Sequence, residues 1–391
     1  METLLNKDDT VIHLQVLTGI DEAPSDQWDR LVRANYPFLK SAFLGAMERF
    51  DCVGEDVGWI PKHLCYFQNK TMLAAMPLYE KHNSWGEFVF DHAWADAYHR
   101  HGIEYYPKLL NAIPFTPATG QRLLTGDRGS DEANRETAQI LISGARKLVE
   151  QGKYSGVHCL FPDATDFDLM SSPESVFRTD CQFHWHNKNY GCFDDFLSTL
   201  KSRKKKKIRQ ERRKVKDSGL SIRWIDGNET TEQDWTEFTR VYRQIYDRKY
   251  GMPAFNQSFF MDVAEAMPDQ VQLVLAENQG TVVAGALMYC DDTTLYGRHW
   301  GCNQYVDSLH FELCYYQGIE FCIRNGLKKF DPGAQGEHKI ARGFLPTATR
   351  SLHWMAYSPF NSAIRQFVEH EQKGVQQYID AVAKHSPYNC D

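Results

Sequence analysis

The pattern of apolar and polar positions predicts a mixed α/β structure for the second half of the chain. Short apolar runs, which are typical of strands, alternate with stretches in which apolar residues recur every three or four positions, which is typical of helices. The predicted order is strand, helix, helix, three strands, helix, strand, at residues 220–225, 231–249, 255–266, 271–277, 282–289, 294–300, 309–323 and 328–331. Asn278-Gln279-Gly280 predicts a hairpin turn between two of the strands. The helix at 309–323 is apolar almost all round, which favours an interior helix packed across a sheet.

The first half repeats this pattern more weakly. Strands are predicted at residues 63–67, 73–79 and 87–91. Trp94 and Trp300 lie 206 positions apart, as do Gly120 and Gly326, and a helix candidate follows each tryptophan. A shared offset indicates duplication. We therefore predict two tandem domains of mixed α/β type, residues 1–190 and residues 191–391.

The second domain is expected to open with a basic amphipathic helix at residues 193–216. Its apolar residues fall on one narrow face: Phe193, Phe196, Leu197, Leu200, Ile208 and Val215. Residues 201–216 hold eleven Lys or Arg and one acid, Glu211. Candidates for contact with a polyanion are Arg203, Lys204, Lys205, Lys206, Lys207, Arg209, Arg212 and Arg213. Three interpretations stay open, namely docking to RNA or another polyanion, binding of a substrate phosphate, and a solvated helix face.

Composition agrees with two domains and excludes several classes of protein. A chain of 391 residues exceeds the size of an ordinary single core, and 42% hydrophobic with 24% charged residues is typical of globular proteins. No apolar run approaches the roughly 18 residues of a membrane span, and the first ten residues are polar. We therefore expect a cytoplasmic protein. The ten scattered cysteines favour free thiols.

The strongest candidate for chemistry is the segment 331–342. Asp331 ends a predicted strand, and Glu337, His338, Lys339 and Arg342 follow within one glycine-bearing turn. Residues of these types can supply a general base, donors for an oxyanion and cations for an anionic group. Glu337 or His338 would serve as the base, and Lys339 and Arg342 as cations. The alternative is a salt-bridged loop without a chemical role.

Other polar clusters are weaker candidates. Arg298 and His299 are neighbours on one predicted strand, so only one of them reaches a cleft, and His299 also fits a core position. In the first half the candidates for substrate binding are Asp91, His92, Tyr105, Tyr106 and Lys108. A zinc site is disfavoured because the spacing of its potential ligands matches no common pattern: Cys181, His184, His186 and Cys192. The sequence contains no Walker loop, dinucleotide fingerprint or Ser-His-Asp motif.

Several longer strings resemble the bacterial family of predicted N-acyltransferases described as FemAB-like, or as peptidoglycan biosynthesis or recognition proteins. They include Gly58 to Leu64, Gly86 to Asp91, Tyr105 to Leu109, Pro114 to Pro117, Phe183 to Trp185, Ser202 to Arg213 and Phe330 to Lys339. The resemblance runs from about Trp28 to Glu369. It implies two tandem acetyltransferase-type (GNAT) domains, with the strand at 294–300 as the one whose backbone polarises the acyl carbonyl in GNAT folds.

Two departures from the related families stand out. GNAT enzymes hold the coenzyme A pyrophosphate on an Arg/Gln-x-x-Gly-x-Gly/Ala loop, whereas residues 301–307 hold one glycine and place Asp307 where phosphate would bind. Fem-type transferases carry a two-helix arm, and this chain has one basic helix.

We therefore expect an N-acyltransferase that moves an acyl or aminoacyl group to an amine acceptor in a cleft between the domains, in cell-wall metabolism. Acyl-CoA and aminoacyl-tRNA are both candidate donors, and the acceptor is a small molecule or a peptide. The alternative is a non-catalytic GNAT-like protein that grips tRNA or another polyanion through the basic helix.

Overall fold

The computed structural model of the protein describes residues 3–5, 11–126, 130–248, 251–334 and 336–389. The chain divides into two compact units. Unit 1 comprises residues 1–180 and 349–376, and unit 2 comprises residues 181–348 and 377–391. The chain therefore changes units inside the strands β9 (Val176–His186) and β15 (Leu345–Met355), and again inside helix α12 (Ser358–Ala383). The sequence predicted one boundary near residue 190, because a segment that returns to an earlier unit leaves no compositional break.

Unit 2 is built on an antiparallel meander that continues into a parallel pair. Its strands are β10 (Ser221–Asp226), β11 (Val271–Asn278), β12 (Thr281–Cys290), β13 (Thr294–Cys302) and β14 (Lys329–Asp331). The pairs β10 with β11, β11 with β12, and β12 with β13 are antiparallel, whereas β14 runs parallel to β13 and antiparallel to the end of β9. The predicted hairpin and the third strand of the meander are confirmed.

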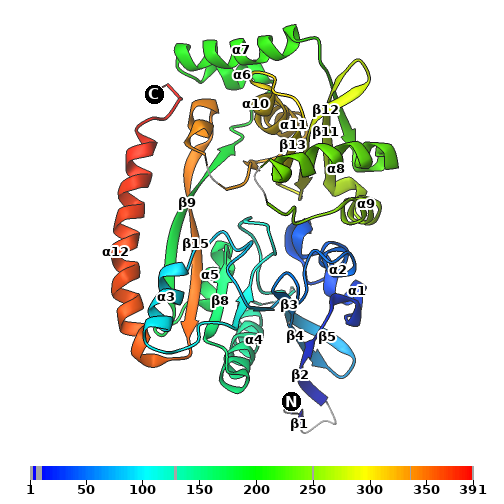
Figure 1. The fold of residues 1–391 in the computed structure, drawn as a ribbon. Coiled ribbons are helices and arrows are strands. Elements are labelled where there is room, and N and C mark those ends of the chain that lie inside the picture. Colours follow the sequence, from blue (N-terminus) through cyan, green and yellow to red (C-terminus); the bar gives the residue numbers. More distant parts are fainter. Residues whose placement is uncertain (1–2, 6–10, 127–129, 249–250, 335, 390–391) are drawn as a thin grey trace. The chain divides into compact units, whose positions relative to one another are not determined.

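The helices of unit 2 pack on this sheet. Helix α8 (Glu232–Asp247) lies across β12 and β13 and is followed by α9 (Gln257–Ala266) (Figure 1). The predicted interior helix is confirmed but has three parts, α10 (Leu309–Phe311), the π-helical segment η6 (Glu312–Tyr316) and α11 (Gln317–Arg324). A π-helical turn within a helix frequently marks a functional site. The core of the unit lies between these helices and the sheet, where Leu295, Ile319 and Phe330 are fully buried.

The basic segment forms two helices, so the prediction of one continuous helix is wrong. Helix α6 spans Phe193–Ser198 and α7 spans Ser202–Asp217. Leu200 forms a β-bridge with Tyr388, and the Lys201 N–H donates to the Pro387 carbonyl over 2.8 Å. These contacts with the last residues of the chain replace the helical hydrogen bonds and interrupt the helix. The amphipathic pattern holds across the break, because Phe196, Ile208 and Val215 are buried.

Unit 1 contains two sheets. The first has the order β1 (Thr3–Leu5), β2 (Val11–Leu17), β4 (His63–Gln68) and β5 (Thr71–Met76). The second has β3 (Trp59–Pro61), β6 (Tyr79–Lys81), β7 (Lys108–Asn111) and β8 (Gly156–Leu160), and β8 pairs with the part of β15 that belongs to this unit. Its helices are α1 (Ser25–Asp29), α2 (Ser41–Arg49), α3 (His92–Arg100), α4 (Asp131–Gly152) and α5 (Ala164–Met170), and the first part of α12 also belongs to it.

The two units repeat one arrangement, a strand, a crossover helix and a parallel strand. In unit 1 the elements are β7, α4 and β8, and in unit 2 they are β13, α10 to α11, and β14. The 206-residue offset between the halves is wrong, however, because Trp94 lies inside helix α3 and Trp300 lies in strand β13. The crossover helix of unit 1 is α4, which lies beyond Gly120. The two units therefore share an arrangement of elements. The equal spacing of the tryptophans and glycines does not identify corresponding positions in them.

The predicted strand at residues 87–91 is wrong as well. Residues 84–91 form an irregular segment that leads into α3. Gly86 has φ of 81° and Phe88 has φ of 60°, which is incompatible with a strand. The side chains of Glu87 and Asp91 are buried and bind Lys108, so the segment is held by side chains and not by a ladder.

No helix in the described part of the chain combines the length and apolar character that a membrane span requires.

Candidate functional site

The candidate site of unit 2 lies where two parallel strands separate. The pairing of β13 with β14 ends at Tyr296 and Asp331, while β13 continues to Cys302. Just beyond this point β13 has a bulge, because Leu287 pairs with His299 and Met288 pairs with Gly297, which leaves Arg298 as the extra residue. Bulges redirect side chains and are common next to active sites. Here the bulge brings Arg298 beside the end of β14.

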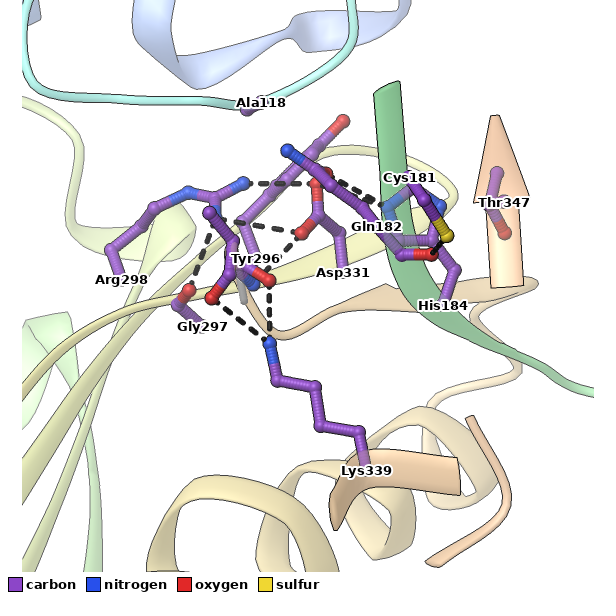
Figure 2. Close-up of polar contacts among 12 residues, drawn as sticks. Ala118, Cys181, Gln182, His184, Tyr296, Gly297, Arg298, Asp331, Lys339 and Thr347 are labelled. Carbon is purple, nitrogen blue, oxygen red and sulfur yellow. Dashed lines mark hydrogen bonds and ion pairs between the residues drawn. The ribbon is translucent and has the colours of Figure 1, made fainter. Parts of the chain in front are cut away.

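Arg298 and Asp331 form a buried ion pair at this position. Arg298 Nη2 lies 3.1 Å from Asp331 Oδ2, and the Gly333 N–H donates to Asp331 Oδ1 over 2.9 Å (Figure 2). His184, from β9, places Nε2 3.7 Å from Asp331 Oδ2. Burial alone would raise the pKa of Asp331, but Arg298 and His184 hold this pKa well below its usual range. Asp331 is therefore a buried anion that fixes Arg298 and the start of the following turn.

Lys339 reaches the same region from the short helix η7 (Glu337–Arg342). Its Nζ donates to the Gly333 carbonyl over 2.6 Å and to the Ala334 carbonyl over 3.3 Å (Figure 2). The side chain is buried, and burial lowers the pKa of Lys339 to about 8 against the opposing charge of Asp331. Lys339 can therefore exist as either ammonium or amine near neutral pH.

His338 lies on the exposed side of this turn. Its Nε2 is 2.8 Å from the Tyr315 hydroxyl, and its ring lies near Phe311 and His310. Gly336, with φ of 104°, allows the ring to fold back, because a Cβ there would stand 2.4 Å from the His338 ring. Burial, followed by the charges of Arg342 and Lys339, lowers the pKa of His338. The imidazole is therefore neutral at physiological pH.

Two other residues of the predicted site make contacts away from this cluster. Glu337 is exposed and accepts a hydrogen bond from Tyr378 over 2.9 Å. Arg342 is buried, and its Nη2 lies 2.7 Å from Glu211 Oε1 while Nη1 donates to the His338 carbonyl over 2.6 Å. The charge of Arg342 is therefore balanced by an acid of helix α7, and this pair joins the turn to that helix.

His299 points away from Arg298, as expected for neighbours on a strand. Its ring lies within 5.5 Å of the rings of Tyr242, Phe255 and Phe260. Burial, and after it the charge of Arg298, lowers the pKa of His299 to about 3. The core interpretation of His299 fits these contacts.

The loop at residues 301–307 does not fit a coenzyme A pyrophosphate. A Cβ at Gly301 would stand 2.4 Å from the Tyr242 backbone nitrogen, so this glycine serves close packing on α8. Asp307 binds Lys214 over 2.6 Å, and Ser308, with φ of 69°, precedes the helix. A carboxylate thus occupies the helix N-terminus that would have to receive phosphate.

Some basic side chains of helix α7 pair with acidic residues, and others are exposed. Arg212 binds Glu312 and Glu320 over 3.0 and 2.7 Å, and Arg209 binds Asp194 over 2.8 Å. The exposed basic residues are Lys201, Arg203, Lys206, Lys207, Arg209, Arg213, Lys214 and Lys216. A groove of about 540 Å³ runs along this helix, lined by Arg209, Arg212, Arg213, Val215, Lys216, Leu220, Ile222, Glu312 and Gln317.

The residues predicted in the first half form a buried cluster in unit 1. Lys108 Nζ donates to Glu87 Oε2 over 2.8 Å and also to Asp91 Oδ2. The Tyr105 hydroxyl donates to Asp91 over 2.6 Å, and the Tyr106 hydroxyl lies 2.6 Å from Ser84 Oγ. His92, in contrast, is exposed.

Unit 1 also has a cavity of about 670 Å³ elsewhere, near the start of α4. It is lined by Arg30, Leu31, Val32, Arg33, Thr125, Gly126, Asn134, Arg135, Thr165, Asp168 and Leu169. Arg33 binds Asp163 and Asp166 over 3.1 and 2.7 Å, so part of its basic lining is neutralised. None of the predicted site residues lines this cavity.

Sequence reasoning missed several of the buried polar residues. His184 was considered only as a zinc ligand, although Gln182 and His184 alternate along one face of β9 and their side chains lie 3.2 Å apart. Glu87, His158 and His353 were not singled out. A histidine in a continuous apolar strand such as Val157 to Leu160 is the signal that could have found His158.

Comparison with known proteins places the chain in a family. The model of the FemAB-like family, described as peptidoglycan biosynthesis/recognition, matches residues 19–390, and the chain belongs to this family. Its fold is of the mixed α/β class. No curated protein matches the sequence.

The chain is similar to several solved structures. The structure of FemX is similar with a TM-score of 0.53 at 10% identity, over 91% of this chain and 100% of that chain. L-PGS from Bacillus licheniformis matches with a TM-score of 0.49 at 9% identity, over 83% of this chain and 95% of that one. A tandem GNAT protein from the clavulanic acid pathway matches with a TM-score of 0.41 at 10% identity, over 88% of this chain and 98% of that one.

Proposed function

We propose that the protein is an N-acyltransferase that moves an acyl or aminoacyl group to an amine acceptor, with its reaction site at the end of β14 in unit 2. The observation that carries the proposal is the group of Arg298, Asp331 and Lys339 around the point where β13 and β14 separate. His338 precedes Lys339 on the same short helix and contacts Tyr315. Membership of the FemAB-like family supports the reaction class and a role in cell-wall metabolism.

Each residue has a distinct part in this proposal. His338, which is neutral and exposed, accepts the proton that the acceptor ammonium must lose before it can attack. Lys339 in its ammonium form donates to the oxyanion of the tetrahedral intermediate. Asp331 and Arg298 are positioning residues, because they fix the turn that carries both groups. Glu337 is exposed beside His338 and would attract the acceptor ammonium.

The transfer balances as follows. The amine nitrogen attacks the acyl carbon, a C–N bond forms, and the bond from the acyl carbon to the carrier oxygen or sulfur breaks. The acceptor ammonium loses two protons in all, of which one goes to the leaving oxygen or sulfur and the other to solvent. Aminoacyl-tRNA is the donor we favour over acyl-CoA, because the loop at residues 301–307 does not fit a pyrophosphate.

Transfer can be tested directly by mass spectrometry of the full-length protein with aminoacyl-tRNA or acyl-CoA and small amines or peptides. We expect at least tenfold slower transfer in His338→Ala, since general bases typically contribute 10² to 10⁴ in rate. His385→Ala, an exposed histidine of the same unit, is the matched control and should transfer normally. Equal rates in both variants would remove His338 from the mechanism.

A second function rests on helix α7. Its exposed cations and the adjoining groove offer an extended basic surface, which suits the phosphates of a tRNA or another polyanion. Fluorescence anisotropy with a labelled RNA hairpin should show binding that weakens with salt, and Lys206→Gln/Arg213→Gln should lower both the affinity and the salt slope. An RNA affinity that does not change in this variant would contradict the assignment. A protein that binds RNA but transfers nothing would be a binding module.

A further inference from the structure

Several buried polar atoms of unit 1 have no hydrogen-bond partner among the described residues, and four of them belong to side chains around Lys108 and helix α3. They are Glu87 Oε1, Asp91 Oδ1, Trp94 Nε1 and His158 Nε2. Each of the four residues that carry these atoms has an exposed fraction of 4% or less. Buried polar groups in native proteins are almost always paired, so four in one region require a common explanation.

These four atoms belong to one cluster. Lys108 binds both Glu87 and Asp91. The charge of Asp91 acts on His158, and the rings of Trp94 and His158 lie 6.3 Å apart. Because the four side chains come from an irregular segment, from helix α3 and from strand β8, tertiary structure alone brings them together.

Among the described cations near the cluster, one is in direct contact with its carboxylates. This ammonium, that of Lys108, faces the carboxylates of Glu87 and Asp91. The charge of Lys81 acts on Glu87 and Asp91 from farther away, and Arg178 lies over the Trp94 ring. Lys81, directly opposite Lys108 on the next strand, is held by Asn83 and lies over the Trp59 ring. Burial, with the charge of Lys108 among its other causes, lowers the pKa of Lys81 to about 7. A second cation in direct contact would stabilise the two carboxylates further, because they share one contacting ammonium in a buried position.

A pair of histidines determines whether His158 Nε2 carries a proton. His158 Nδ1 lies 2.7 Å from His353 Nδ1, and His353 Nε2 lies 2.9 Å from Ser351 Oγ. Burial keeps both rings neutral, so one proton lies between the two Nδ1 atoms. The direction of the Ser351 hydrogen bond then decides whether His158 Nε2 donates or accepts.

The backbone next to the cluster is strained. Phe88 is a bulky residue with φ of 60°, and the same irregular segment exposes Trp85 and Phe90. Non-glycine residues in this conformation cost free energy and concentrate at ligand-binding positions. The strain therefore agrees with a binding role for the segment at residues 84–91.

We propose that unit 1 carries a ligand site of its own that takes a primary ammonium group with a neighbouring oxygen. Glu87 Oε1, Asp91 Oδ1 and His158 Nε2 accept the ammonium N–H donors, and Trp94 Nε1 donates to the oxygen. The ligand class is thus a small amino alcohol or amino acid amide. Binding at this site is independent of transfer in unit 2, so the two proposals fail separately.

The test uses ethanolamine as the probe and the full-length protein, followed by the imidazole ¹⁵N resonances of His158 and His353. Their assignments come from His158→Asn and His353→Asn. We expect a saturable shift with ethanolamine, a weaker one with ethylamine, which lacks the oxygen, and none with ethylene glycol, which lacks the amine.

Variants separate a built site from general binding. Glu87→Gln should weaken ethanolamine binding at least tenfold, and Glu104→Gln, an exposed glutamate of the same unit, should not. Trp94→Phe should abolish the preference for ethanolamine over ethylamine, and it serves as the test if Glu87→Gln does not fold. The absence of a saturable shift, or equal affinity in the wild-type protein, Glu87→Gln and Trp94→Phe, would overturn the proposal.

Discussion

At the scale of single residues, the two units carry buried charge in different ways. In unit 2 one cation, Arg298, matches one anion, Asp331, and the pair holds a turn in place. In unit 1 Lys108 faces two carboxylates. Burial, opposed by Lys108, raises the pKa of Glu87, whereas Lys108 and Tyr105 overcome burial and hold the pKa of Asp91 at about 2. Residue types alone could predict that these side chains are polar candidates, but partners distant in sequence decide their charge.

The Arg298 and Asp331 pair should show strong energetic coupling. Arg298→Met and Asp331→Asn should each lower the free energy of unfolding by about 3 kcal/mol, because each leaves one buried charge alone. Arg298→Met/Asp331→Asn should lose less than the sum of the two single losses, by at least about 1 kcal/mol. Urea denaturation measures all three. Additive losses would show that the pair is not a unit.

Lys339 should make stability depend on pH in a predictable direction. Its pKa is about 8 in the folded protein, against an ordinary value of 10.5. Between these two pKa values the unfolded chain binds more protons than the folded chain. The contribution of Lys339 to the free energy of unfolding should therefore rise with pH, by about 3 kcal/mol in total. Lys339→Met should remove this contribution, and Lys328→Met, at an exposed lysine, should keep it. Identical pH profiles of Lys339→Met and the wild-type protein would contradict the buried ammonium.

At the scale of elements, sequence periodicity predicted most of unit 2 and less of unit 1. The meander of β11, β12 and β13 follows from long apolar strands with a clear turn at Gln279-Gly280. The segment at residues 87–91 was wrongly predicted as a strand because Phe88, Val89 and Phe90 are residues that favour strands. In the structure its two acidic side chains are buried and bind Lys108. The break before α7 could not be predicted either, since it depends on residues near 388.

Helix α7 should respond differently to changes on its two faces. Lys206→Gln/Lys207→Gln/Lys216→Gln should change the free energy of unfolding by no more than about 0.5 kcal/mol, because these three side chains are exposed. Arg212→Met should cost about 3 kcal/mol, because it leaves the buried Glu312 without its cation. Thermal or urea denaturation distinguishes the two. A large loss in the triple variant would show that the lysines serve the fold.

At the scale of the whole molecule, both units contain a strand, a crossover helix and a parallel strand. Each unit is assembled from segments that are separated in the sequence. Strand β8 pairs with the part of β15 that contains Leu352 and Trp354, and both side chains belong to the core of unit 1. Because these residues follow all of unit 2's sheet strands in the sequence, composition along the chain could not assign them to unit 1.

A fragment that ends at residue 190 should therefore not fold as unit 1 does. It lacks the partner strand of β8 and the core residues of β15, so we expect a non-cooperative urea transition and weak near-ultraviolet circular dichroism. Adding a second fragment, residues 345–391, restores the missing strand and should restore part of the signal. A cooperative transition of the first fragment alone would show that unit 1 does not need β15.

The central claim is that acyl transfer takes place at the turn after β14. Its most direct test is the single-turnover rate of the transfer reaction in Lys339→Met, compared with Lys328→Met and with the wild-type protein, at a pH where all three are folded. Removing one oxyanion donor typically costs 10² to 10³ in rate, so we predict a loss of about that size in Lys339→Met and none in Lys328→Met. A Lys339→Met protein that transfers at the wild-type rate would contradict the account.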